Sequence, residues 1–374
     1  MQIGIPAESL SGETRVAATP ETVKKLLAGG HHRVLVQAGA GLSSSISDGD
    51  FAAAGATVVA GAVEAWAADI VLKVRGPQDG ELSLLRRDQV LVALLAPYKT
   101  EALQALAATG ATGFAMEWLP RISRAQSMDV LSSQANIAGY KAVLMAANAY
   151  GRLMPMLMTA AGTIKAARVV VMGVGVAGLQ AIATAKRLGA VVEATDVRPE
   201  TKEQVESLGA KFIEVPLTEA EKELAKGQGG YARDMGEDYK KRQAQLVAER
   251  IRQADIVITT ALIPGRPAPV LVTVDMVKTM RPGSVIVDMA VEEGGTCPLS
   301  ELDTTVVRHG VNILGVANIP ALVAADASAL YARNLFNFLA LMLDVKSGAF
   351  NLNREDEIVA GTLACMGGEL ARKV

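Results

Sequence analysis

The sequence has only two cysteines, Cys297 and Cys365, which lie far apart and form no CxxC motif. This scarcity argues against a disulfide framework and a zinc cluster, and it fits a reducing compartment. The chain also lacks an apolar run of about 20 residues, the length that a membrane helix needs. Its N-terminus does not have the pattern of a signal peptide. We therefore expect a cytoplasmic protein with no metal centre.

The sequence also lacks an excess of one charge sign, because it has 37 Lys and Arg residues and 39 Asp and Glu residues. The balance argues against a nucleic-acid partner. Aromatic residues make up 4% of the chain, and the three histidines are His31, His32 and His309. Since each histidine lies in a loop pattern, we expect all three to face solvent. A Ser-His-Asp centre is not evident.

The sequence is rich in short apolar segments that alternate with amphipathic ones. Its 374 residues favour two domains, and the alternation favours parallel α/β layers. We predict an α/β fold with two Rossmann-like, doubly wound parallel-sheet domains joined by long helices. The N-terminal domain comprises residues 1–132 and 318–374, and the second domain, 133–317, is inserted into it. The long helices are expected at 131–154 and 322–343, followed by a polar tail.

Local patterns place the individual elements within this scheme. A helix is predicted at Pro20–Leu27, with Thr19 as its N-cap and two glycines after its end. Residues 218–241 are rich in glycine and charge, which predicts either a solvated surface loop or a mobile loop near a ligand. Strands are expected at 2–5, 34–36, 70–74, 90–94, 112–115, 168–172, 191–195, 211–215, 255–259, 284–288 and 311–314.

A glycine-rich turn, Gly173-Val-Gly-Val-Ala-Gly178, lies between a predicted strand and a predicted helix. This context is typical of a dinucleotide-binding βαβ unit. Gly173 permits the tight turn, Gly175 lets a pyrophosphate approach the backbone, and Gly178 lets helix and strand pack closely. The free N–H groups at the start of the helix favour phosphate binding. The sequence therefore predicts a dinucleotide site.

Asp196 follows the next predicted strand and selects between the two nicotinamide dinucleotides. A carboxylate there accepts hydrogen bonds from the ribose hydroxyls of NAD(H) and repels the 2′-phosphate of NADP(H). Arg198 lies two residues later, where an arginine could bind that 2′-phosphate. We predict NAD(H) as the cofactor, with the role of Arg198 left open.

Several segments together resemble the NAD(H)-binding domain I of proton-translocating nicotinamide nucleotide transhydrogenase. The resemblance covers nearly the whole chain. The segments that carry it are Gly4–Glu8, Arg15–Ala17, Pro120–Asp129, Leu131–Gln134, Met158–Gly162, Gly173–Gly189, Ala194–Arg198, Thr201–Gly209, Thr259–Gly265 and Val287–Gly295.

The resemblance implies direct hydride transfer from NADH on this chain to NADP⁺ on a separate domain III. A transmembrane domain II couples that transfer to proton movement. Because one nicotinamide passes hydride to another, no substrate acid–base group is needed, which accounts for the missing catalytic histidine. The family's signature loop maps onto Arg121, Gln126 and Asp129, which hold the nicotinamide and its ribose. The glycine-rich region at 218–241 corresponds to the family's mobile loop.

The resemblance also implies the remaining site residues and the partners. We expect a homodimer that is peripheral to the inner membrane on its cytoplasmic side, attached through an NADP(H)-binding domain III subunit and a transmembrane domain II subunit. The expected cofactor-binding residues are Ser132, Gly173, Val174, Gly175, Val176, Gly178, Asp196, Val197, Arg198, Gly230, Tyr231, Thr260 and Leu262.

Alanine dehydrogenase resembles the same sequence and is the alternative. In that family an arginine and a lysine hold the substrate carboxylate, and Arg15 and Lys73 match them. The position of the family's histidine falls in Val92–Ala96, which has none, and its aspartate position is Glu292. The missing histidine argues against oxidative deamination. A non-enzymatic NAD-sensing module is a third possibility, which the complete loop of Arg121–Asp129 disfavours.

Overall fold

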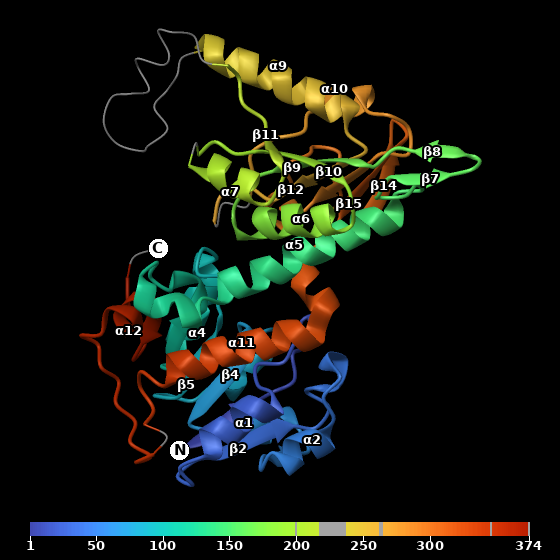
Figure 1. The fold of residues 1–374 in the computed structure, drawn as a ribbon. Coiled ribbons are helices and arrows are strands. Elements are labelled where there is room, and N and C mark those ends of the chain that lie inside the picture. Colours follow the sequence, from blue (N-terminus) through green and yellow to red (C-terminus); the bar gives the residue numbers. More distant parts are fainter. Residues whose placement is uncertain (199, 217–236, 262–264, 345, 373–374) are drawn as a thin grey trace. The chain divides into compact units, whose positions relative to one another are not determined.

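The computed structural model describes residues 1–198, 200–216, 237–261, 265–344 and 346–372. The chain divides into two compact units, each built on its own mainly parallel sheet (Figure 1). Unit 1 comprises residues 1–134 and 320–374, and unit 2 comprises 135–319. The predicted α/β class with two Rossmann-like domains is confirmed. The unit boundaries lie two residues beyond the expected domain boundaries at 132 and 317.

Unit 1 contains an eight-stranded sheet with the order β17-β16-β6-β5-β4-β1-β2-β3. Strands β1 to β6 pair in parallel, and β16 runs antiparallel to β6. The strands are β1 (Gln2–Ile5), β2 (Arg33–Gln37), β3 (Thr57–Val59), β4 (Ile70–Arg75), β5 (Val90–Leu94), β6 (Thr112–Ala115), β16 (Leu363–Met366) and β17 (Glu369–Leu370).

Helices cover both faces of this sheet. Alternate residues of β4 point to opposite faces: Ile70 and Leu72 pack with α1 and α11, whereas Val71 packs with α3 and α4. The helices are α1 (Pro20–Leu27), α2 (Asp48–Ala53), α3 (Ala62–Trp66), α4 (Thr100–Ala108), α11 (Ala324–Leu339) and α12 (Glu357–Thr362), with 3₁₀ turns η1 (Leu42–Ser44), η2 (Glu81–Leu84), η3 (Met116–Trp118), η4 (Ser123–Met128) and η6 (Ile319–Val323).

Local signals were accurate for α1 and less so for the long helices. Thr19 caps α1 by accepting a hydrogen bond from the Thr22 amide, as predicted. Helix α5 (Val130–Ala149) ends before Gly151, a poor helix former, and not at residue 154. The predicted polar tail is wrong, because α12, β16 and β17 follow α11. Leu363 and Cys365 are buried when β16 pairs with β6.

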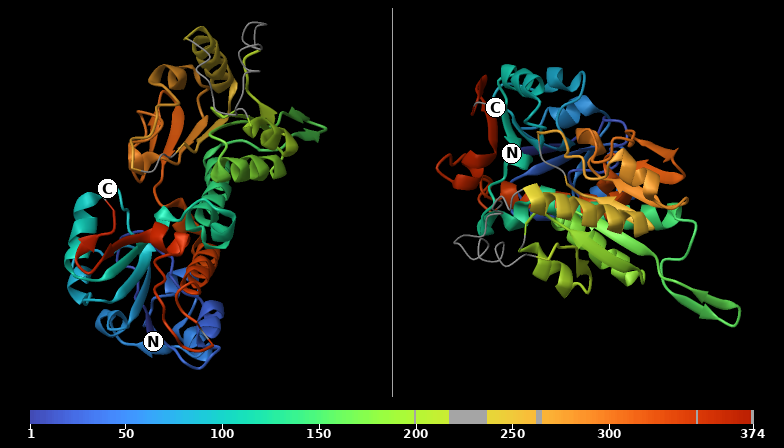
Figure 2. Two further views of the ribbon diagram at one scale, coloured as in Figure 1. Left: turned by 90° about the vertical axis from the view of Figure 1, so that its left-hand side faces the viewer. Right: turned by 90° about the horizontal axis from the view of Figure 1, so that it is seen from above.

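Unit 2 contains a seven-stranded sheet with the order β11-β10-β9-β12-β13-β15-β14. All pairs are parallel except β14 with β15 at one edge. A separate hairpin, β7 (Leu157–Thr159) and β8 (Gly162–Ile164), projects from the rest of unit 2 (Figure 2). The strands of the main sheet are β9 (Arg168–Met172), β10 (Val191–Thr195), β11 (Lys211–Phe212), β12 (Ile256–Thr259), β13 (Val285–Asp288), β14 (Thr304–Arg308) and β15 (Val311–Gly315).

The helices of unit 2 also lie on both faces of its sheet. Figure 1 shows α9 (Glu237–Gln253) and α10 (Val274–Thr279) on one side, and α6 (Val176–Arg187) and α7 (Thr201–Ser207) on the other. In β9, Val169 packs with α6, while Val170 packs with α9 and α10. A 3₁₀ turn, η5 (Val291–Glu293), follows β13.

Of the expected loop at 218–241, residues 237–241 belong to α9, and residues 218–236 lie outside the described residues. No helix in the described ranges has both the length and the apolar character to cross a membrane. In those same ranges, no group of three or more His, Cys, Asp or Glu side chains is placed to hold a metal ion.

Candidate functional site

The glycine turn lies where the strand order of unit 2 reverses. The chain passes from β9 to β10 and β11 on one side, and then returns to place β12 on the other side of β9. In open parallel sheets, ligands bind at the carboxyl ends of the strands beside such a reversal. Gly173 directly follows β9, and α6 begins three residues later at Val176. The fold therefore places the turn at the position that a dinucleotide site requires.

The three glycines of the turn have different surroundings. Gly173 has a φ of +97°, a conformation that favours glycine. A Cβ added to Gly178 would lie 1.9 Å from the Gly173 carbonyl oxygen, so only glycine allows α6 to approach the turn. A Cβ at Gly175 would meet no atom within 4 Å. The open space at Gly175 beside the N-terminus of α6 suits a phosphate group.

Thr260, which directly follows the neighbouring strand β12, closes the turn. Its amide donates to the Met172 carbonyl at 2.9 Å, and its hydroxyl donates to the Gly173 carbonyl at 2.9 Å. Val174 is buried in the core of unit 2, whereas Val176 is partly exposed. The sequence assigned Thr260 to the cofactor site, and the structure adds that this residue supports the backbone of the turn.

Asp196 binds the glycine turn through its carboxylate. One oxygen accepts a hydrogen bond from the Val174 amide at 2.6 Å, and the other accepts from the Arg198 amide at 2.9 Å and its Nε at 3.0 Å. Burial alone would raise the pKa of Asp196, but hydrogen bonds from Arg198 and Val174 hold it below its ordinary value. A fixed negative charge therefore lies beside the turn, and Val197 next to it is largely exposed.

The 120–129 loop carries the signature residues and lies in unit 1. Arg121 and Gln126 are exposed, and their side chains make no hydrogen bond within the described ranges. The Asp129 carboxylate accepts hydrogen bonds from the Ser132 amide at 2.9 Å and the Ser132 hydroxyl at 2.6 Å. This is the geometry of a helix N-cap, so Asp129 also begins helix α5.

The predicted site residues thus form two sets. Arg121, Gln126, Asp129 and Ser132 share one loop and helix start in unit 1, while the glycine turn, Asp196 and Thr260 meet in unit 2. Gly230, Tyr231 and Leu262 lie outside the described residues.

Unit 1 contains a cluster of buried charges around the carboxyl ends of β1 and β4. Arg15 donates to Glu13 through Nε at 2.8 Å and Nη2 at 2.6 Å, and Lys73 donates to both oxygens of Glu81. Although burial alone would raise it, the hydrogen bonds and charge of Arg15 lower the pKa of Glu13 to about 2. The sequence reading matched Arg15 and Lys73 to a family pattern but missed their carboxylate partners, which are visible in the sequence only as acidic residues close to them.

Glu8 in the same cluster provides a prediction for pH dependence. Burial raises the pKa of Glu8 from 4.5 to about 7, although Lys73 Nζ lies 3.7 Å from its carboxylate. The folded chain therefore keeps a proton that the unfolded chain releases near pH 4.5, and the resulting stability is lost as the pH rises from 4.5 to 7. Glu8→Gln keeps a neutral side chain at all pH values.

Wild type loses this stability between pH 4.5 and 7, but Glu8→Gln does not. The free energy of unfolding of Glu8→Gln minus that of wild type should therefore rise by about 3 kcal/mol over this pH range. Urea unfolding of both proteins at pH values between 4 and 8 measures this difference. A difference that stays constant with pH would show that Glu8 titrates normally.

The structure places no histidine at the carboxyl end of β5. The backbone amides of Leu95 and Ala96 donate instead to the Glu117 carboxylate, at 3.1 Å and 2.7 Å. Burial raises the pKa of Glu117 above its ordinary value. Ala96 has a φ of +47°, an uncommon conformation for a residue other than glycine. Leu94, which ends β5, has no titratable group, so the titratable side chain at this end of the strand is Glu117.

The histidines lie elsewhere, and the prediction that all three face solvent is wrong for His32. His31 and His309 are exposed, but His32 is only 4% exposed at the start of β2. Burial lowers the pKa of His32 below its ordinary value. The residue next to it in the sequence is exposed, and the strand period of two turns His32 inward. Glu292, in η5, is exposed.

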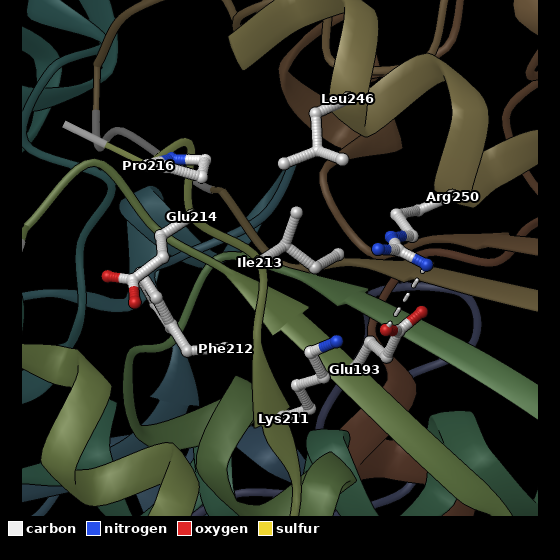
Figure 3. A pocket seen from close by; sticks show the side chains of 8 residues that line it. All are labelled: Glu193, Lys211, Phe212, Ile213, Glu214, Pro216, Leu246 and Arg250. Atoms are coloured by element: carbon white, nitrogen blue, oxygen red, sulfur yellow. Dashed lines mark ion pairs between the residues drawn. The ribbon is translucent and has the colours of Figure 1, made fainter. Parts of the chain in front are cut away.

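A cavity of about 310 Å³ lies beside the edge of the unit 2 sheet (Figure 3). In its lining, Glu193 of β10 and Arg250 of α9 form an ion pair, 3.9 Å apart. Lys211, Phe212, Ile213, Glu214, Pro216 and Leu246 complete the lining. None of the predicted cofactor residues that the structure describes lines this cavity, which is therefore separate from the glycine turn.

Two family models match the chain. The alanine dehydrogenase/PNT N-terminal domain matches residues 4–138, and the alanine dehydrogenase/PNT C-terminal domain matches residues 142–373. The chain belongs to the alanine dehydrogenase/PNT family. Within this family it is similar to an NAD(P) transhydrogenase alpha-subunit protein of Rhodospirillum rubrum, with 53% identity over 377 residues, which cover 99% of this chain and 97% of the relative.

A solved structure and a more distant relative support the same assignment. The crystal structure of transhydrogenase from Sinorhizobium meliloti is 52% identical and has a TM-score of 0.90, covering 99% of this chain and 100% of that chain. The alanine dehydrogenase of Lysinibacillus sphaericus is 32% identical over 346 residues, which cover 89% of this chain and 85% of the relative. This family member is thus more similar to these transhydrogenase proteins than to that alanine dehydrogenase.

Proposed function

We propose that this chain is the NAD(H)-binding component of a proton-translocating NAD(P) transhydrogenase. The observation that carries the proposal is the glycine turn at the strand reversal of unit 2, with the Asp196 carboxylate bound to the Val174 amide. The similarity to the R. rubrum subunit over 99% of the chain supports the choice of reaction.

The residues of the glycine turn fit a bound dinucleotide. The open space at Gly175 suits the pyrophosphate, as do the amides at the start of α6, where Gly175 provides no capping side chain. The Asp196 carboxylate suits the ribose hydroxyls of NAD(H). Bound NADH supplies a hydride from its nicotinamide ring. The proposed lining residues are Ser132, Gly173, Val174, Gly175, Val176, Gly178, Asp196, Val197, Arg198, Gly230, Tyr231, Thr260 and Leu262.

The remaining site residues position reactants and do not move protons. In our proposal Arg121 and Gln126 bind the nicotinamide and its ribose, since both side chains are exposed and make no hydrogen bond within the described residues. Gln126 helps to bring the two nicotinamide rings together, and Asp129 holds Ser132 and the start of α5. Positioning of this kind accounts for a large part of the rate of a transfer between two bound groups.

The alternative, alanine dehydrogenase, is less favoured because the position of that family's acid–base histidine has no titratable side chain here. Oxidative deamination releases a proton as well as a hydride. Val92–Ala96 contains no side chain able to accept that proton, and the Arg15 and Lys73 cations bind the Glu13 and Glu81 carboxylates. Transfer of hydride between two nicotinamides needs no such group.

The proposal includes partner subunits. An NADP(H)-binding domain III subunit receives the hydride, and a transmembrane domain II subunit couples the transfer to proton movement. The chain then works as a homodimer, peripheral to the cytoplasmic side of the inner membrane.

An activity assay separates the two functions. The purified chain is mixed with the NADP(H)-binding subunit of a transhydrogenase, NADH and an NADP⁺ analogue whose reduced form absorbs at a different wavelength. We expect reduction of the analogue only when both proteins are present. In a parallel reaction with alanine and NAD⁺, formation of pyruvate and ammonia would overturn the proposal.

Asp196→Asn tests the choice of dinucleotide. Because the variant loses the charge that binds ribose hydroxyls and repels a 2′-phosphate, we expect NADH affinity to fall about tenfold and NADPH affinity to rise. Fluorescence titration with each dinucleotide measures both values. Glu193→Gln, on the strand β10 that precedes Asp196 but with its side chain paired to Arg250, is the matched control and should change neither affinity. An unchanged preference in Asp196→Asn would remove Asp196 from the site.

A further inference from the structure

The 120–129 loop contains an unusually long 3₁₀ segment. Helix η4, Ser123–Met128, has 6 residues, whereas 3₁₀ runs beyond about four residues are uncommon because their hydrogen bonds are poorly aligned. Ala125 and Met128 point into the core of unit 1, which leaves Gln126 between them on the surface. A 3₁₀ segment of this length needs contacts with other parts of the chain to keep one conformation.

Helix α11 supplies support at the end of η4. The side-chain amides of Asn334 and Asn337 donate to the Ser127 carbonyl at 2.8 Å and 3.0 Å. The Asn334 carbonyl oxygen also accepts a hydrogen bond from the Ser133 hydroxyl at 2.7 Å. One buried asparagine therefore joins the end of the loop to the start of α5.

A charged contact supplies support near the start of η4. Arg124 binds Asp356 with two parallel hydrogen bonds, Nη1 to Oδ2 at 2.7 Å and Nη2 to Oδ1 at 3.0 Å. Two-point pairs of this type are directional as well as strong. Asp356 is itself fixed, because its Oδ1 accepts from the Ile358 amide at 2.8 Å and caps α12.

The segment after α11 contacts the loop at further points. A Cβ added to Gly361 of α12 would lie 3.2 Å from Pro120 Cδ, so the helix packs closely on the loop. The Arg372 guanidinium lies 3.5 Å from the centre of the Trp118 ring and donates to the Gly361 carbonyl at 2.9 Å. Residues 356–372 thus hold the side of the loop that precedes Gln126.

We propose that Arg124 and Asp356 are positioning residues for hydride transfer, because their ion pair fixes the loop that presents Arg121 and Gln126. The inference rests on the proposed function. Neither residue needs to touch the cofactor. The pair joins positions 232 residues apart in the sequence, so the last part of the chain contributes to the site without carrying a site residue.

Arg124→Gln and Asp356→Asn test the proposal in the complete complex with partner subunits. Asparagine keeps the cap of α12 but loses the charge. We expect each variant to lower kcat of hydride transfer about tenfold, with the KM for NADH changed less than about twofold, because the loop sets ring orientation more than binding. The double variant should be no slower than either single variant, since both remove one contact.

Glu21→Gln is the matched control. Glu21 forms a comparable ion pair with Arg333 on the surface of unit 1, at 2.5 Å and 3.0 Å, and this pair joins α1 to α11 instead of the loop. We expect this variant to keep the wild-type kcat. If Arg124→Gln also keeps it while the wild type transfers hydride, the positioning role is overturned.

Amide hydrogen exchange on the NADH-bound chain tests, independently of activity, whether the Arg124–Asp356 pair holds the 120–129 loop in place. We expect the amides of residues 124–129 to exchange about tenfold faster in Arg124→Gln and to stay unchanged in Glu21→Gln. Unchanged exchange in Arg124→Gln would overturn the proposal. A wild-type complex that transfers no hydride while exchange responds as expected would contradict the proposed function alone.

Discussion

Gly178→Ala is expected to abolish NAD(H) binding and to destabilise unit 2. The new methyl group would lie 1.9 Å from the Gly173 carbonyl oxygen and 2.9 Å from its carbon. These are backbone atoms, so α6 or the turn must shift as a whole. Overpacking of this kind costs about 1–3 kcal/mol. Urea unfolding measures the loss of stability, and fluorescence titration with NADH should show affinity reduced by at least about a hundredfold.

Gly175→Ala separates binding from stability in the same turn. Its methyl group meets no atom within 4 Å, so we expect wild-type unfolding behaviour. NADH affinity should still fall, by about tenfold, because the methyl group occupies the space that a pyrophosphate approaches. If Gly178→Ala binds NADH as well as wild type, the turn is not the cofactor site. If Gly175→Ala does so, the phosphates bind elsewhere.

Asp288→Asn is expected to lower the free energy of unfolding by about 3 kcal/mol. Asp288 is fully buried at the end of β13, where one oxygen accepts from the Thr296 amide at 2.8 Å, the Cys297 amide at 3.0 Å and the Ser300 hydroxyl at 2.7 Å. The other oxygen accepts from the Ala290 amide at 3.1 Å. Asparagine replaces one carboxylate oxygen by an NH2 group, which would then face hydrogen-bond donors. A buried group left without its hydrogen-bond partner costs about 1–3 kcal/mol, and more when a charge is lost.

The control for this variant is Asp275→Asn. Asp275 pairs with Lys278 on the surface of α10, and its side chain is 90% exposed. Exposed pairs contribute about 0–1 kcal/mol, so unfolding in urea should be nearly unchanged. Equal losses in the two variants would mean that the carboxylate of Asp288 does not organise the segment after β13.

Prediction from sequence succeeded where the signal was local and repeated. The strands of both sheets are short apolar runs buried on two faces, and the cap at Thr19 and the glycine turn depend on residues close together in the chain. The edges were harder. β14 is exposed on most of its residues and so lacks the apolar signal of a central strand, while β16 has only four residues, which is too short for a periodic pattern to identify it.

Contacts between distant residues account for what sequence reading missed. The Arg124–Asp356 pair and the asparagines that hold Ser127 join residues more than 200 positions apart. The capping role of Asp129 depends on a local pattern, because its partner Ser132 lies three residues later, whereas the family resemblance implies only a cofactor role for Asp129. The burial of His32 was missed because the residue lies in a loop pattern, directly before the first residue of β2.

The fate of the hydride tests the proposed function most directly. NADH carrying deuterium at the transferred C4 position is mixed with the chain, its NADP(H)-binding partner subunit and NADP⁺. If the site transfers hydride directly between two nicotinamides, all of the deuterium should appear at C4 of NADPH, with none in water. Deuterium released to water, or the absence of labelled NADPH from the complete mixture, would contradict the account.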